Sequence, residues 1–223
     1  MPASAVLRHS PAALLTTAVV VPLALAAVAD GIRLRRRLAE AGRDRLTGAL
    51  RGESWTPRAQ RLLARHHDQA VVLLVDLDHF KQINDTHGHA VGDLVLAESA
   101  ARLTDWAGPR DIVGRLGGDE FAVLTLIDPR HHQLRLAHLI RLLAEPVATG
   151  TGPVDVAASI GAASPGTAGT TDLSPLQRAA DAALYEGKHT GRVILAGPRH
   201  HTVPSVNGRR AGRPGTATLR QAA

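Results

Sequence analysis

The sequence is organised around the stretch Arg115-Leu116-Gly117-Gly118-Asp119-Glu120-Phe121. It lies between two short apolar runs, residues 112–113 and 121–124, which predict β-strands. Gly117 and Gly118 supply the positive φ angles of a tight hairpin turn. The neighbouring carboxylates of Asp119 and Glu120 repel each other unless a cation takes up their charge. The stretch therefore predicts a hairpin whose turn is either a cation site or only a solvated turn.

A second acidic group follows the most apolar run of the chain. Residues 70–75 are all apolar, which is typical of a strand buried on both faces, and Asp76-Leu77-Asp78 come directly after them. A carboxylate at the end of such a strand fits a functional site better than a core. The ordinary alternative is that Asp76 only caps the strand.

Helical and strand patterns alternate along the chain. We expect helices over residues 54–66, 89–105 and 132–144, and a further helix that starts at Ser174-Pro175. Residues 154–162 and 192–195 predict strands. Together with the hairpin, this alternation predicts an α/β or α+β sandwich in which helices cover a sheet.

These patterns carry a resemblance to a known family. Between and after the two acidic stretches stand Phe80, Lys81, Asn84, Asp85, Gly88, His89, Gly92, Asp93, Tyr185, Lys188, Gly191 and Arg192. Together with the acidic stretches, these residues resemble the GGDEF family of diguanylate cyclases, which condense two GTP into cyclic di-GMP. The resemblance covers about residues 44–196 and implies the palm-like, ferredoxin-related fold of nucleotide cyclases, with helices flanking a central, mostly antiparallel sheet.

The resemblance implies a metal site. It places metal ligands at Asp76, at the backbone carbonyl of Leu77 and at Asp119, and it implies that Glu120 is needed for activity. Mg²⁺ is usually held by one or two carboxylates, with substrate phosphates and waters completing the shell. Mg²⁺ is therefore the expected cofactor, with Mn²⁺ as an alternative.

The resemblance also implies a GTP site. It assigns guanine recognition to Asn84 and Asp93 and places His89 and Phe80 near the substrate. Lys81, Lys188 and Arg192 would neutralise phosphate oxygens, and Lys81 joins Asp119 and Glu120 as a catalytic residue. Two ordinary alternatives stay open: His89 as a histidine at a helix start, and Lys188 as a cation favoured after a helix end.

Composition limits the other functions. The 223 residues include no cysteine, which excludes disulfides, thiolate metal sites and a cysteine nucleophile. The formal net charge is +6, and residues 198–223 contain five arginines and no acid, so the excess charge lies mainly in the tail. The middle of the chain has no basic stripe with interleaved aromatics, and we expect no nucleic-acid partner.

The N-terminal segment predicts a membrane anchor. Residues 12–29 carry no charge and are long enough for one membrane helix. Arg33 and residues 35–37 follow it, whereas Arg8 precedes it, which favours a single-pass anchor in the cell membrane with the downstream domain in the cytoplasm. A cleaved signal peptide ending at Ala27-Val28-Ala29 and a peripheral segment are the alternatives.

The chain is therefore expected to have four parts. These are residues 1–30 with the membrane helix, a basic juxtamembrane helix over 31–43, the cyclase domain over 44–197 and a disordered basic tail over 198–223. The expected function is a Mg²⁺-dependent diguanylate cyclase that releases pyrophosphate and acts as a homodimer. The alternative is a catalytically silent module that binds GTP or cyclic di-GMP and relays a signal to a partner. The family's Arg-x-x-Asp product site has Gly108 in place of its arginine, so product inhibition there should be weak or absent.

Overall fold

The computed structural model describes residues 23–34, 40–188, 190 and 192–201. The chain divides into two compact units, Met1–Gly42 and Arg43–Ala223. In the first unit, residues 23–34 are helical, and Asp30 forms an ion pair with Arg33. Residues 12–22 of the expected membrane segment and residues 35–39 of the expected linker helix lie outside the described residues. Among the helices that the structure does describe, none is both long and apolar enough to cross a membrane.

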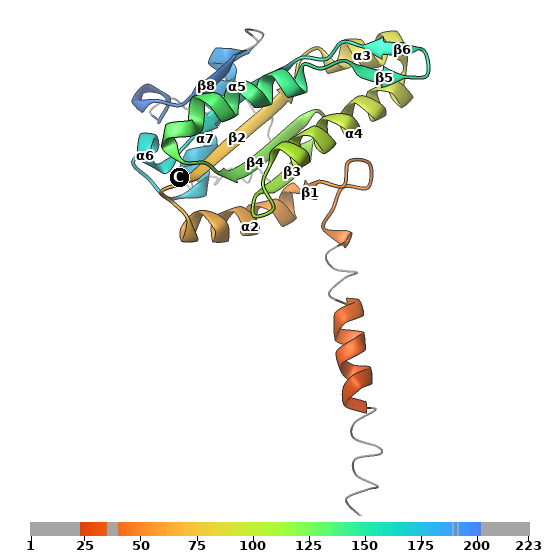
Figure 1. Cartoon of the computed structure of the whole chain (residues 1–223), viewed down its shortest axis with the longest axis vertical. Helices are drawn as coiled ribbons and strands as arrows, with labels where there is room; N and C mark the ends of the chain where they lie inside the picture. The colour runs from red at the N-terminus through yellow and green to blue at the C-terminus, as the bar shows by residue number, and fades with distance from the viewer. Residues whose placement is uncertain (1–22, 35–39, 189, 191, 202–223) are drawn as a thin grey trace, which may run out of the picture. The chain divides into compact units, whose positions relative to one another are not determined.

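The second unit is built on a six-stranded sheet with the order β1-β3-β4-β2-β7-β8 (Figure 1). Its strands are β1 (Leu50–Arg51), β2 (Ala70–Leu77), β3 (Ile112–Gly117), β4 (Glu120–Leu126), β7 (Ala158–Ala163) and β8 (Val193–Leu195). The four central strands pair antiparallel, whereas β1 and β8 pair in parallel at the two edges. The antiparallel centre predicted for the sheet is confirmed. With the crossover helices between β2 and β3 and between β4 and β7, these four strands have the βαββαβ order of ferredoxin-like domains.

Helices cover both faces of the sheet. They are α2 (Gly52–Arg65), α3 (Phe80–His87), α4 (His89–Trp106), α5 (His132–Leu143), α6 (Pro165–Ala168) and α7 (Leu173–Gly187). One apolar core joins α4 and α5 to one face, and a second joins α2 and α7 to the other. Figure 1 shows α4 and α5 along one side of the sheet and α2 along the opposite side. The predicted flanked sheet is confirmed.

The pattern of β2 explains why this strand is central. All eight of its residues are buried. Side chains alternate between the faces of a strand, so Val71, Leu73 and Val75 enter the core with α4 and α5, and Val72 and Leu74 enter the core with α2 and α7. An unbroken apolar run is what a strand covered on both faces requires.

Some elements differ from the expectations. The strand expected over 154–162 is confirmed for residues 158–162, which belong to β7, but its start is wrong. Val154 ends a separate hairpin formed by β5 (Val147–Thr149) and β6 (Gly152–Val154), and β7 begins only at Ala158. The helix start at Ser174 is also wrong. The helix α7 begins at Leu173 after Asp172, because Leu173 is itself buried in the core and belongs to the helix.

The expected tail also begins with ordered structure. Residues Pro198–His201 form a short 3-10 helix, η2. The buried ring of His200 lies 3.0 Å from a carboxylate oxygen of Glu186, and Arg199 donates to the other oxygen at 2.7 Å. The first residues after position 197 therefore pack on α7, and the residues from 202 onward lie outside the described part of the chain.

Candidate active site

Asp76 stands where the buried central strand β2 ends. It lies opposite Glu120 of β4 on one side and opposite Ser159 of β7 on the other. The residue is buried, with 8% of its surface exposed. The ammonium of Lys188, directly after α7, lies 3.1 Å from its carboxylate. The sheet and α7 thus bring together two predicted site residues that are 112 positions apart in the sequence.

The electrostatics of Asp76 favour a cation beside it. Burial raises the pKa of Asp76 above its usual value, Lys188 opposes this rise, and the charges of Asp119 and Asp78 add to it. The net direction is upward, so Lys188 alone does not compensate for the burial and crowding of these carboxylates. Within the described residues, no group of three or more His, Asp or Glu side chains is arranged to hold a metal alone. A hard cation that also binds substrate phosphates and water fits such an incomplete set.

The hairpin turn between β3 and β4 is fixed to the end of β2. Gly118 has φ of 53°, a left-handed conformation that glycine adopts readily. The amide of Leu77 donates to the carbonyl of Asp119 at 3.3 Å. Leu77 and Asp119, both predicted metal ligands, are therefore linked directly through their backbones.

Arg115 connects this turn to the start of the domain. Its Nε donates to the carbonyl of Gly118 at 2.9 Å, and its Nη1 lies 3.0 Å from Asp44. Burial would raise the pKa of Asp44, but hydrogen bonds from Thr47 and the contact with Arg115 outweigh it and lower the pKa. Asp44 also accepts from Gly48 through its backbone carbonyl at 2.9 Å, so the turn over residues 43–49 is well held.

The expected base-reading residues come from α3 and α4. The left-handed His79, with φ of 56°, turns the chain from β2 into α3. Asn84 is half-buried on α3, and Gly88, with φ of 84°, separates this helix from α4. Asp93 lies in the second turn of α4 and is exposed. The helices α3 and α4 pack against each other, which brings Asn84 and the chain at Asp93 together.

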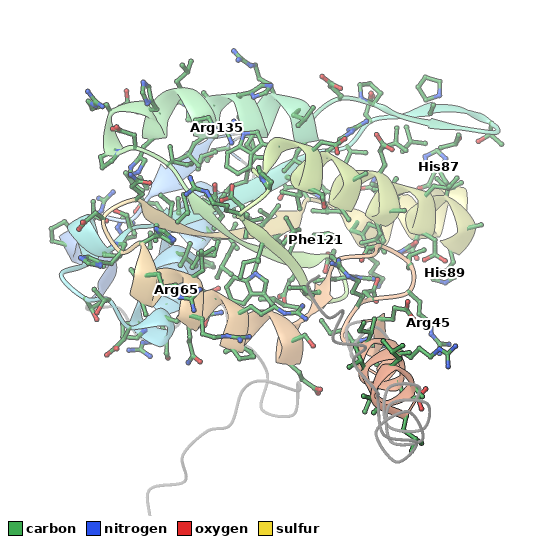
Figure 2. The ribbon with its side chains drawn as sticks, turned by 60° about the horizontal axis from the view of Figure 1, so that its bottom comes forward. Arg45, Arg65, His87, His89, Phe121 and Arg135 are labelled. Atoms are coloured by element: carbon green, nitrogen blue, oxygen red, sulfur yellow. The ribbon has the colours of Figure 1, made fainter. Side chains whose placement is uncertain are left out.

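The other expected residues are mostly at the surface. Lys81, His89 and Arg192 are exposed, and Phe80 is half-buried against the core beneath α3. Figure 2 shows His89 at the outer surface of the domain and Phe121 inside it, between the layers. The structure therefore gathers Asp76, Leu77, Asp119 and Lys188 at one point and leaves Lys81, His89 and Arg192 open to solvent.

Two residues of this region were not predicted as site residues. Asp78 is buried and accepts a hydrogen bond from Ser159 at 2.8 Å, and its charge acts on Asp76. Arg115 holds the hairpin turn. The sequence signal for both is position, because Asp78 follows Asp76 by two residues and Arg115 precedes the two glycines by two.

The Asp of the expected product site is engaged within the fold. Asp111 accepts from the amide of Gly108 at 2.7 Å, from the hydroxyl of Thr125 at 2.7 Å and from the amide of Leu126 at 3.1 Å. Both of its carboxylate oxygens therefore have partners, and position 108 offers no side chain.

Comparison with known proteins identifies the class of this fold and site. The family model "Diguanylate cyclase, GGDEF domain" matches residues 41–193. The chain belongs to the GGDEF family, and its class is that of the diguanylate cyclases, which are nucleotidyltransferases.

Individual relatives support this assignment. An uncharacterized 19.3 kDa protein of Streptomyces ambofaciens is 42% identical over 79% of this chain and 94% of its own. The response regulator PleD of Caulobacter vibrioides is 36% identical over 69% of this chain, but the match spans only 35% of PleD. The solved GGDEF domain of TpbB (YfiN) from Pseudomonas aeruginosa is 35% identical, with a TM-score of 0.65, over 71% of this chain and 96% of that one.

The burial of Asp76 predicts a gain in stability when its charge is removed. A raised pKa means that the folded state binds the proton more tightly, so wild-type stability falls as pH rises from the usual aspartate pKa to the raised value. At pH 7 without divalent cations, Asp76→Asn should therefore raise the unfolding midpoint by about 2–4 °C, the shift that roughly 1 kcal/mol produces in a domain of this size.

Thermal unfolding with and without Mg²⁺ checks this prediction. Wild type should gain stability on adding Mg²⁺ with a nucleotide, and Asp76→Asn should gain little. Asp105→Asn, at an exposed position of α4, is the matched control and should behave as wild type. A lower midpoint for metal-free Asp76→Asn would show instead that the pair with Lys188 outweighs the cost of burial.

Proposed function

We propose that this chain is an active diguanylate cyclase, which joins two GTP molecules into cyclic di-GMP and releases two pyrophosphates. The observation that carries the proposal is the placement of Asp76, Leu77 and Asp119 around the end of β2, with Lys188 beside them. Burial keeps the pKa of Asp76 raised despite the neighbouring ammonium, so further positive charge beside this carboxylate would stabilise its ionised form. A divalent cation bound to a triphosphate supplies that charge.

The reaction assigns a task to each group. The 3′-oxygen of each GTP forms a bond to the α-phosphorus of the other, and pyrophosphate leaves. Asp76, Asp119 and the carbonyl of Leu77 would hold Mg²⁺, or Mn²⁺ in its place, and the cation would neutralise charge on the triphosphate. Lys81, Lys188 and Arg192 would contact phosphate oxygens, and Glu120, opposite Asp76 in the sheet, completes the acidic group.

Guanine would be read between α3 and α4. The base presents donors at N1 and N2 and an acceptor at O6, which an amide and a carboxylate can match. Asn84 of α3 and Asp93 of α4 are residues of these types, and Phe80 and His89 stand at the starts of the same two helices. The half-buried position of Asn84 gives its hydrogen bonds to a base more weight than exposed ones have.

Product formation tests the proposal. Purified protein incubated with GTP and Mg²⁺ should yield cyclic di-GMP, detected by chromatography and mass. Asp119→Asn keeps the side-chain shape but removes a charge, so turnover should fall by roughly two to three orders of magnitude while the fold is retained. The control is again Asp105→Asn. Binding of GTP without any product from wild type would favour the silent module, and near-normal turnover of folded Asp119→Asn would exclude its proposed role.

We further propose that the enzyme works as a two-fold homodimer. The product is symmetric and each domain offers one set of base-reading residues, so two domains must face each other. Specific activity should therefore rise with enzyme concentration, and a fused parallel coiled coil should raise it further at low concentration. Kinetics over a dilution series, with the oligomeric state measured by light scattering, checks this. Constant activity per molecule for a domain that stays monomeric contradicts the dimer.

The proposed location is the cell membrane. The uncharged residues 12–29, followed by Arg33 and the basic residues 35–37, support a single-pass anchor with the cyclase domain in the cytoplasm. Recovery of the full chain in the soluble fraction after cell lysis and ultracentrifugation would count against this anchor.

A further inference from the structure

The helices α3 and α4 approach each other closely at Gly92. This residue is buried on α4, and a Cβ atom placed on it would lie 1.9 Å from Oδ1 of Asn84 and 2.9 Å from its Cγ. The ring of Phe80 would lie 3.3 Å away. Non-bonded carbon atoms do not approach other heavy atoms to within 2 Å. The amide of Asn84 can therefore lie where it does only because position 92 has no side chain.

The contact at Gly92 differs from an ordinary packing glycine. At Gly161, a Cβ would meet the backbone of α7, at the carbonyl of Ala180 and the amide of Leu184, so that glycine lets a helix pack on the sheet. At Gly92 the obstacle is instead the polar end of one side chain. A glycine within a helix destabilises it relative to alanine. The contact with Asn84 gives a reason for glycine at a position where alanine would be the better helix former.

We propose that Gly92 is a specificity-determining position, which sets how deeply the Asn84 amide lies between α3 and α4. The inference rests on the proposed function, in which Asn84 and Asp93 read guanine. Gly92 makes room for the amide of Asn84, and the next residue in α4 is Asp93. The contact at Gly92 thus sets the position of the Asn84 amide relative to the residue that carries the second base-reading group.

A methyl group at position 92 leaves the chain two responses. Asn84 rotates outward, or α3 and α4 move apart at this point, and in both cases the amide leaves its place. Asn84 carries one acceptor and one NH₂ donor, and guanine and adenine differ in which of these their edges match. A displaced amide leaves hydrogen-bonding groups of guanine unpaired, which weakens the binding of GTP. The binding of ATP is not weakened, because Asn84 does not recognise adenine.

The experiment compares four proteins: wild type, Asn84→Ala, Gly92→Ala and the double variant. Calorimetry measures the affinity for GTP and for ATP, with Ca²⁺ in place of Mg²⁺ to prevent turnover. Asn84→Ala and Gly92→Ala should each reduce the GTP-to-ATP affinity ratio roughly tenfold, and the double variant should lose no more than either single one. Gly166→Ala, where a Cβ meets nothing within 4 Å, is the matched glycine control and should keep the wild-type ratio.

Thermal unfolding of the same proteins tests the steric contact separately. Gly92→Ala should lower the unfolding midpoint when Asn84 is present. In the Asn84→Ala background the same change should leave the midpoint equal or raise it, because the obstructing amide is gone and alanine favours the helix. A midpoint that falls equally in both backgrounds would make Gly92 a packing residue only and would overturn the inference.

A second variant keeps the test decisive if Gly92→Ala does not fold. Asn84→Gln retains the amide but adds one methylene, which displaces the amide from its position beside Gly92. It should lose the GTP-to-ATP preference as Asn84→Ala does, and retention of the wild-type ratio would overturn the proposal. Absence of GTP binding by wild type would instead reject the proposed function, and selective wild-type binding with an unchanged ratio in Gly92→Ala would reject only this inference.

Discussion

The site depends on a carboxylate held at the end of a strand that has no solvent on either face. The apolar residues of β2 contribute to two separate cores, one on each face of the sheet, and Asp76 stands near the end of this strand. Asp76 is therefore desolvated by the same packing that stabilises the fold. A buried charge that is only partly compensated has a higher free energy than a solvated one, and this energy is available to bind a cation. The core would thus prepare the proposed cation site.

The remainder of the proposed cation site is positioned by long-range contacts that converge on the hairpin turn. The amide of Leu77 donates to the carbonyl of Asp119, and Arg115 donates to the carbonyl of Gly118 and to the carboxylate of Asp44. Asp44 belongs to the turn over residues 43–49 that opens the domain. The side chain of Arg43 donates to the carbonyl of Gly48, the amide of Thr47 donates to the side chain of Asp44, and the amide of Asp44 donates to the carbonyl of Ala49.

The sequence patterns identified the long elements that are buried along one face, as α4 and α5 are, or on both faces, as β2 is. The apolar run of β2 and the periodicity of α4 and α5 each match the structure, because one packing environment extends along the whole element. The helix α3 was not expected, since its eight residues present only Phe80 and Ile83 to the core. The small residues of β7 did not indicate where this strand begins. Asp78 and Arg115 acquire their roles from partners 81 and 71 residues away, and no local pattern reports such contacts.

The two halves of the proposed site follow different physical rules. The half proposed to bind a cation stands on the sheet, where Asp76 is buried and Asp119 and Lys188 are half-buried, so the cores set the position of Asp76. The nucleotide half lies on α3, α4 and the segment after α7, where Lys81, His89, Asp93 and Arg192 are exposed. Exposed cations hold phosphate weakly in water and become effective when solvent is excluded. If two such domains close on two GTP molecules, each domain excludes solvent from the exposed cations of the other. A single domain that already buried these groups would have no open face through which the second nucleotide could be reached.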